Sequence, residues 1–138
     1  MRSDRGSVTL WTLGLSVLLL LFGGLSIDFW RALALQRELA AVADSMAVAA
    51  ASGIDEERYR LTGEVVIDPG RARGLGSGYA AAQDVDLVGL EVSTSSDGTS
   101  VSVRVVAELE LGLIGVFVDR TEPLTVSAGA TALPVLVP

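Results

Sequence analysis

The chain opens with one long apolar stretch. No charged side chain occurs from Gly6 to Ile27, which matches the roughly 20 apolar helical residues that a bilayer core about 30 Å thick requires. Trp11 and the pair Phe29–Trp30 stand near the two ends, as the residues of an aromatic belt do. The pattern predicts a transmembrane helix over residues 7–27.

Two other interpretations of the apolar run are weaker. A buried helix of a soluble protein would need more surrounding sequence than a chain of 138 residues leaves. A cleaved secretory signal has an apolar core of about 7–15 residues, shorter than this one. The triplet Ala32-Leu33-Ala34 resembles a cleavage site, but it lies within a continuing helical pattern. We therefore expect an uncleaved anchor.

The residues before the apolar run suggest its orientation. Arg2 and Arg5, together with the amino terminus, outweigh the single acid Asp4. Positive flanks stay on the cytoplasmic side of a membrane. Residues 1–6 are therefore expected in the cytoplasm and everything after Asp28 outside it, which places a single-pass protein in the cytoplasmic membrane.

The helical pattern continues beyond the membrane over residues 28–53. This segment contains strong helix formers and, before Gly53, neither Gly nor Pro. Apolar residues recur at steps of three and four along one face, a helix-packing face made of Leu35, Leu39, Val42 and Met46. Two interpretations of this amphipathic helix stay open: its apolar face packs on the β domain of the same chain, or it packs against neighbouring subunits, and both can hold together.

A charge pair is expected where the helix leaves the membrane. Asp28 follows the last uncharged residue of the run, and Arg31 lies three residues later. Residues at this spacing are neighbours on a helix surface. The pair lowers the cost of placing an acid at the membrane boundary.

The region 54–138 has mainly β patterning. Residues 87–95 and 100–109 alternate between apolar and polar, and the Asp97-Gly98 dipeptide between them is a strong hairpin signal. Residues 124–134 predict a final strand. The fold class is therefore α+β, a long N-terminal helix with a small antiparallel β domain.

The rest of this region carries weaker signals. Residues 55–58 form a charged linker or helix end, and residues 61–67 predict a short strand. Asp68 before Pro69 is typical of a helix start, although the glycines that follow favour a flexible turn over 74–78. That turn lacks the spacing of a phosphate-binding loop and its Lys-Ser/Thr pair. The apolar residues 113–117 fit a buried core better than a contact with a membrane or partner.

Composition narrows the function. The net charge is -7, and all ten basic residues are arginines spread along the chain, which disfavours nucleic acid as a partner. Cys and His are absent, so the usual zinc and haem ligands are missing and no cofactor is expected. Acid pairs such as Asp84 with Asp86 and Glu108 with Glu110 share one solvent face, which does not indicate catalysis. We expect no enzyme, no catalytic residue and no metal site.

A family resemblance rests on the order of short motifs in the first third of the chain. These are Arg5-Gly6-Ser7, Gly23-Gly24, Ile27-Asp28, Arg31, Arg37-Glu38-Leu39 and Ala43-Asp44 before an alanine-rich run. The segment resembles the TadE/TadG-like proteins of tight-adherence (Flp) pilus systems. The resemblance implies a pilin-like architecture, with membrane lipid and other pilin-like or TadE/TadG-like subunits as partners through the N-terminal helix, in a homo- or hetero-oligomer.

The resemblance also implies a possible processing site. Prepilin-like proteins are cut after a glycine, which corresponds to Gly6, so that Ser7 would become the new N-terminus. A glutamate is expected at the fifth mature position, where this chain has Trp11. That departure is closer to the TadG type and argues against cleavage and against a role as the major filament subunit.

Two functions follow from these observations. The first is a minor pilin-like structural or assembly component of a Tad/Flp-type pilus or a related secretion apparatus. The second is a bitopic envelope scaffold or binding protein unrelated to pili. Neither requires a cofactor.

Overall fold

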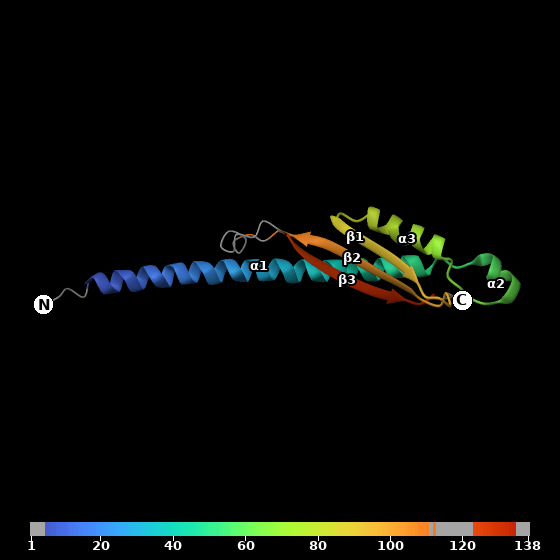
Figure 1. Cartoon of the computed structure of the whole chain (residues 1–138), viewed down its shortest axis with the longest axis horizontal. Coiled ribbons are helices and arrows are strands. Elements are labelled where there is room, and N and C mark those ends of the chain that lie inside the picture. The colour runs from blue at the N-terminus through green and yellow to red at the C-terminus, as the bar shows by residue number, and fades with distance from the viewer. Residues whose placement is uncertain (1–4, 111, 113–122, 135–138) are drawn as a thin grey trace.

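The computed structural model describes residues 5–110, 112 and 123–134, with side chains from Ser7 onward in those ranges. The elements follow the order α1 (Arg5–Ala51), α2 (Glu56–Thr62), α3 (Pro69–Ala81), β1 (Leu87–Thr94), β2 (Val101–Leu109) and β3 (Leu124–Ala132). The sheet lies over the C-terminal half of α1 and over α3, while the N-terminal half of α1 projects away from it (Figure 1). The expected α+β class is confirmed.

Helix α1 is continuous over 47 residues, or about 70 Å at ~1.5 Å per residue. Hydroxyls that would otherwise be unpaired donate to carbonyl oxygens four residues earlier, Thr12 to Val8 at 2.8 Å and Ser16 to Thr12 at 2.9 Å. The helix ends before Gly53, where a Cβ atom would lie 2.8 Å from the backbone nitrogen of Ala72. The close approach of α3 therefore requires glycine at this position.

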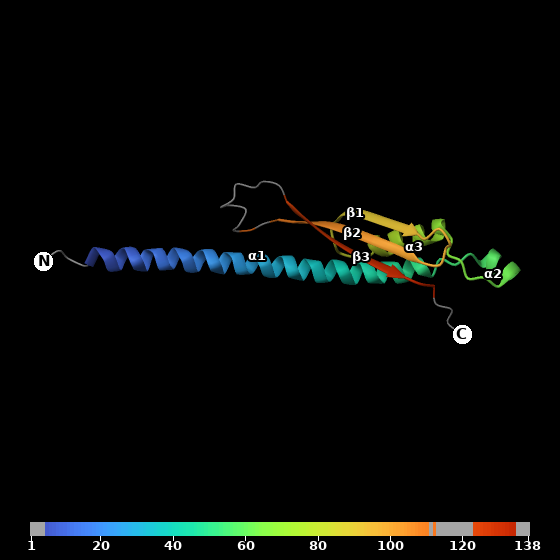
Figure 2. The same ribbon diagram turned by 60° about the horizontal axis from the view of Figure 1, so that its bottom comes forward.

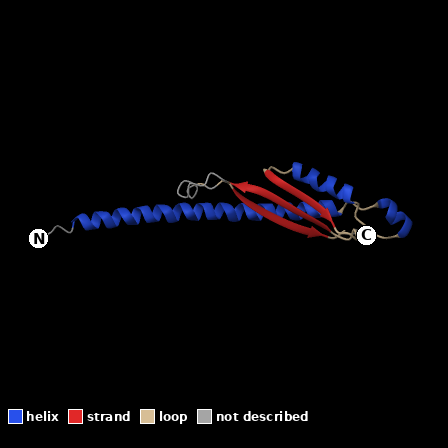
Figure 3. Ribbon diagram, viewed as in Figure 1, coloured by secondary structure: helices blue, strands red, loops and turns tan. Residues whose placement is uncertain are grey.

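The three strands form one antiparallel sheet in the order β1-β2-β3. Figure 3 shows the strands in red as one layer beside the blue helices. The predicted hairpin is confirmed, with Ser93 opposite Ser102 and Val92 opposite Val103. Gly98 lies in the turn with a φ of 70°, a backbone conformation that residues other than glycine rarely adopt.

The core lies between the inner face of the sheet and two helices. Val101, Val103 and Val105 of the central strand are buried, while the residues between them are exposed. From α1, Leu39 and Met46 have no exposed surface. Figure 2, turned by 60°, shows β1 and β2 beside α1 and β3 crossing it obliquely.

Two sequence expectations in the connecting region are wrong. Residues 61–67 do not form a strand: α2 continues to Thr62, and Ile67 makes only an isolated bridge with Ile54. The Asp55 carboxylate caps α2 by accepting from the Arg58 N–H at 3.0 Å, which places residues 61 and 62 in a helix. Beyond it, the Val66 carbonyl accepts from the Asp55 N–H at 2.8 Å, and this short pairing does not extend into a strand. The charged residues 55–58 thus begin a helix.

The second error concerns the glycine-rich stretch. Asp68 does cap a helix that begins at Pro69, as expected, with its carboxylate accepting from the Arg71 N–H at 2.7 Å. The helix then continues through Gly74 and Gly76 without a turn. A Cβ atom at Gly76 would lie 3.2 Å from Val92 Cγ2, so close packing on β1 outweighs the low helix propensity of glycine.

The C-terminal expectations are met in part. Strand β3 ends at Ala132, two residues before the predicted end at Pro134. The apolar segment 113–117, expected in the core, lies outside the described residues.

Candidate functional site

The N-terminal part of α1 is an apolar surface that the fold leaves open. Its most apolar 18-residue window has a mean hydropathy of 2.1, and only 6% of that window is buried. Leu20, for example, is 75% exposed. A core helix of a soluble domain would be covered, whereas residues 7–27 extend about 31 Å and all of them except Gly24 are exposed. This length fits a bilayer core of about 30 Å. These properties are those of a membrane anchor.

The predicted helix-packing face lies against the sheet of the same chain. Leu39, Val42 and Met46 are buried there, and Leu35 is half-buried against the same cluster. Of the two interpretations left open by the sequence, the structure supports packing on the chain's own β domain. The side chains of Leu39, Val42 and Met46 are therefore not exposed for contact with another protein.

The membrane-exit residues converge on Gly112, a position 84 residues further along the chain. Asp28 is only 5% exposed, and its Oδ1 atom accepts from the Gly112 N–H at 3.3 Å. A Cβ atom at Gly112 would lie 2.8 Å from Asp28 Oδ1 and 3.6 Å from Arg31 Nη1. Ion pairs within the described ranges join Arg58 to Glu64 and both Arg60 and Arg71 to Glu56.

The hydrogen bond at Asp28 connects the apolar span of α1 to the sheet domain. A carboxylate at the end of an apolar span is costly unless it is hydrogen-bonded. Here the partner comes from the segment that follows β2, so the sheet domain contacts α1 well before the core begins at Leu39. The pairing of Asp28 with Arg31 stays a prediction. The contact with Gly112 was not foreseen, because no local sequence pattern connects positions 84 residues apart.

The possible processing site lies at the very start of α1. The helix begins at Arg5, so the Gly6–Ser7 peptide bond falls in its first turn. Trp11, at the position where the pilin pattern has glutamate, is 79% exposed.

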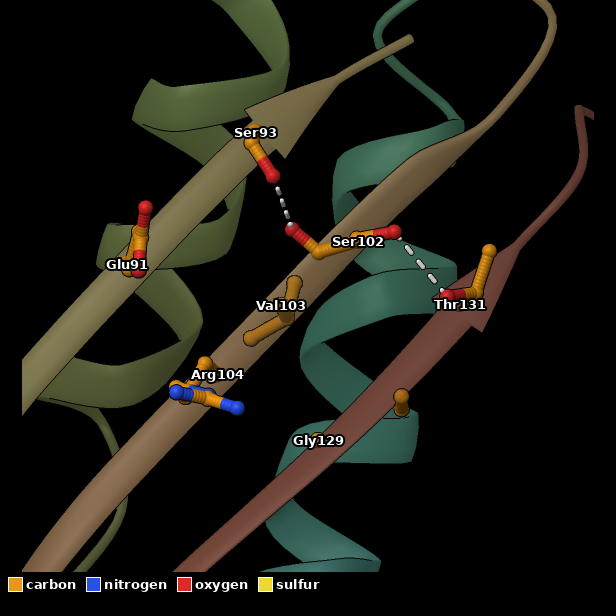
Figure 4. A pocket seen from close by; sticks show the side chains of 8 residues that line it. Glu91, Ser93, Ser102, Val103, Arg104, Gly129 and Thr131 are labelled. Atoms are coloured by element: carbon orange, nitrogen blue, oxygen red, sulfur yellow. Dashed lines mark hydrogen bonds between the residues drawn. The ribbon is translucent and has the colours of Figure 1, made fainter.

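The outer face of the sheet carries a shallow polar concavity of about 320 Å³. Figure 4 shows Glu91, Arg104 and Thr131 along it, with Ser102 bonded to Thr131 through their hydroxyls at 3.0 Å. Glu91 lies directly opposite Arg104 in the strand register. The polar side chains that line the concavity are exposed, as on any sheet face in contact with solvent.

The acid pairs considered in the sequence are also exposed. Asp84 and Asp86 lie before β1, and Glu108 lies near the end of β2 with Glu110 just beyond it. Among the residues that the structure describes, no group of three or more acidic side chains could hold a metal ion.

One titratable group in the described domain has a clearly shifted pKa. The Asp97 carboxylate in the hairpin turn accepts from the Ser95 hydroxyl at 2.6 Å, from the Thr99 hydroxyl at 2.8 Å and from the Thr99 N–H at 3.1 Å. These bonds, the Ser95 hydroxyl first, lower the pKa of Asp97 from 3.8 to about 2. Asp97 is an exposed residue of the hairpin turn, and its hydrogen bonds stay within that turn.

Comparison with known protein families gives a match to the helix α1, and this match does not extend to the sheet domain. Residues 6–53 match the family model described as putative Flp pilus-assembly TadE/G-like. No curated protein and no solved structure matches the chain significantly. The matched region covers about a third of the chain and coincides closely with α1 (Arg5–Ala51). The match therefore supports the family resemblance through this helix.

Proposed function

We propose that this chain is a minor pilin-like assembly component of a Flp-type pilus or a related secretion apparatus. The observation that carries the proposal is the construction of α1. One unbroken helix supplies both an uncovered apolar span and the central core residues of the outer domain. The match of residues 6–53 to a pilus-assembly family supports the same role.

The mechanism is structural. The span at residues 7–27 holds the protein in the lipid, and the rigid continuation of α1 sets the position of the sheet domain outside the membrane. Since Leu39 and Met46 are enclosed by the sheet, the domain and the helix form one unit that moves together. Partner subunits of the same general kind pack on the uncovered side of α1.

The proposal includes an orientation and an unprocessed N-terminus. Arg2 and Arg5 favour a cytoplasmic N-terminus. Trp11 in place of glutamate favours a TadG-type subunit that is not cut between Gly6 and Ser7. Intact-mass measurement of the membrane-extracted protein is expected to show the uncut chain, and a species that begins at Ser7 would contradict this part.

Orientation is tested by labelling, because the natural chain contains no cysteine. Ser96→Cys places a thiol in the exposed hairpin turn, and Ser3→Cys places one before the span. A membrane-impermeant maleimide is expected to label Ser96→Cys in spheroplasts and Ser3→Cys only after lysis. The reverse pattern would overturn the orientation.

The assembly role is tested in the native host by deletion of the gene. The deletion strain is expected to lose surface pili and to regain them when the wild-type chain is supplied. Normal pili in the deletion strain would contradict the proposal and favour an envelope scaffold unrelated to pili.

A further inference from the structure

The side of α1 that faces away from the sheet carries a regular pattern, which we call the outer seam. It consists of Trp30, Ala34, Arg37, Ala41, Asp44 and Val48. The spacing alternates between four and three residues, which is the repeat that keeps one line of a helix directed at a parallel partner helix. All six residues are exposed, Trp30 by 68% and Val48 by 67%.

The outer seam lies opposite the face that forms the core. At ~100° per residue, Ala41 and Val48 lie about 160–200° around the helix from Leu39, and Leu39 is fully buried. Each of the six outer-seam residues is exposed, so no described element covers this side of α1. The outer seam is therefore available to another helix without any change in the core.

The membrane restricts how a second anchored helix can lie on the outer seam. Anchors inserted in the same direction run parallel, and the apolar span of each must sit at the same depth. A shift of one seven-residue repeat would move one span by about 10 Å out of a core about 30 Å thick. Two copies of this chain in one membrane would therefore meet in register.

In register, the charges of the outer seam oppose self-association. Arg37 and Asp44 are separated by one seven-residue repeat, so each would face its own equivalent in a second copy. Neither residue takes part in the ion pairs formed within the described ranges. Facing like charges disfavour a complex, whereas facing opposite charges favour it.

The charge pattern of the outer seam supports a more specific inference, which rests on the proposed function. We propose that the outer seam binds the parallel helix of a second, non-identical single-pass subunit. That partner carries an acidic residue at the depth of Arg37 and a basic residue at the depth of Asp44. The small residues Ala34 and Ala41 let the two helices approach closely.

A charge-exchanged copy of this chain serves as the probe, since it has the predicted partner's charges on the same helix. The full-length protein carrying Ala41→Cys is reconstituted in lipid vesicles with a tagged copy carrying Arg37→Asp, Asp44→Arg and Ala41→Cys. A short thiol crosslinker is expected to give a mixed dimer about tenfold more abundant than the self-dimer of either copy alone. Raising the salt concentration is expected to reduce this preference.

The matched control moves the thiol by one residue. Ala40 is exposed and is also an alanine, but it lies about 100° around the helix from Ala41. Ala40→Cys versions of both copies are expected to show no mixed dimer above the self-dimer level. An equal yield at both positions would mean random collision, which contradicts the proposal.

Other occupants give different results. The Ala41→Cys copy with wild-type charges can be tested alone and in the mixture with the charge-exchanged copy. Equal crosslinking yields in these two samples would show that a second copy in register occupies the outer seam. Stronger crosslinking of Ala34→Cys on one copy with Ala41→Cys on another would show copies shifted by one repeat. No crosslink in any combination would overturn the proposal, while the loss of pili on gene deletion would still support the assembly role.

Discussion

The burial of Leu39 leads to a quantitative test of how α1 and the sheet depend on each other. Leu39→Ala removes three carbon groups from a site with no exposed surface. At ~0.8 kcal/mol for each buried group, the transfer cost is about 2–2.5 kcal/mol, and the cavity raises the loss to about 3–4 kcal/mol. Small domains have a free energy of unfolding of about 5–15 kcal/mol, so this variant loses a large share of it.

The matched control is Leu20→Ala, which removes the same groups from a leucine that is 75% exposed in the apolar span. The assay is urea unfolding of the detergent-solubilised protein. Hydrogen exchange at the backbone amides of β2 serves as a second measurement. Leu39→Ala is expected to lower the free energy of unfolding by about 3–4 kcal/mol, and Leu20→Ala to leave it within about 0.5 kcal/mol. Equal effects of the two variants would refute the conclusion that the sheet domain depends on this face of α1.

Two further predictions concern α3 and the hairpin turn. A Cβ atom at Gly74 would meet nothing within 4 Å, so Gly74→Ala is expected to raise the free energy of unfolding by about 0.5–1 kcal/mol. A Cβ atom at Gly76 would lie 3.2 Å from Val92, so Gly76→Ala is expected to raise the free energy of unfolding by less or to lower it. Equal gains in urea unfolding would contradict the close packing of α3 on β1. Because hydrogen bonds lower the pKa of Asp97 from 3.8 to about 2, its contribution to stability is present above pH 3.8 and is lost as the pH falls toward 2. Asp97→Asn is expected to flatten this part of the pH profile, and an unchanged profile would contradict the assignment.

Much of the architecture was accessible from the sequence, because it depends on repeating local patterns. The apolar run, the amphipathic continuation, the Asp97-Gly98 hairpin and the Asp68-Pro69 helix start all follow from side chains within a few positions of one another. The errors at residues 61–67 and 74–78 have different causes. In the first, α2 takes residues 61 and 62, and the β-branched run that follows pairs with the chain only through the isolated bridge of Ile67 with Ile54. In the second, Gly76 was needed for close contact with Val92, a residue distant in sequence.

The candidate site also combines features that the sequence predicted with features that only the structure showed. The sequence located the apolar face of α1 but left open what covers it, since periodicity shows that a face is apolar and does not identify its partner. The sheet settled that question by enclosing Leu39 and Met46. The Gly112 amide beside Asp28 carried no sequence signal, because the two positions are separated by 84 residues.

The sequence by itself determined that this protein has a helix fit to span a membrane and a small β domain after it. Those properties depend on composition and on spacings of two to seven residues, which any single chain displays directly. Only the tertiary structure decided which side of α1 is enclosed and which stays open. The sheet can cover only one side of a helix, so its placement on the Leu39 face is what leaves Arg37 and Asp44 exposed.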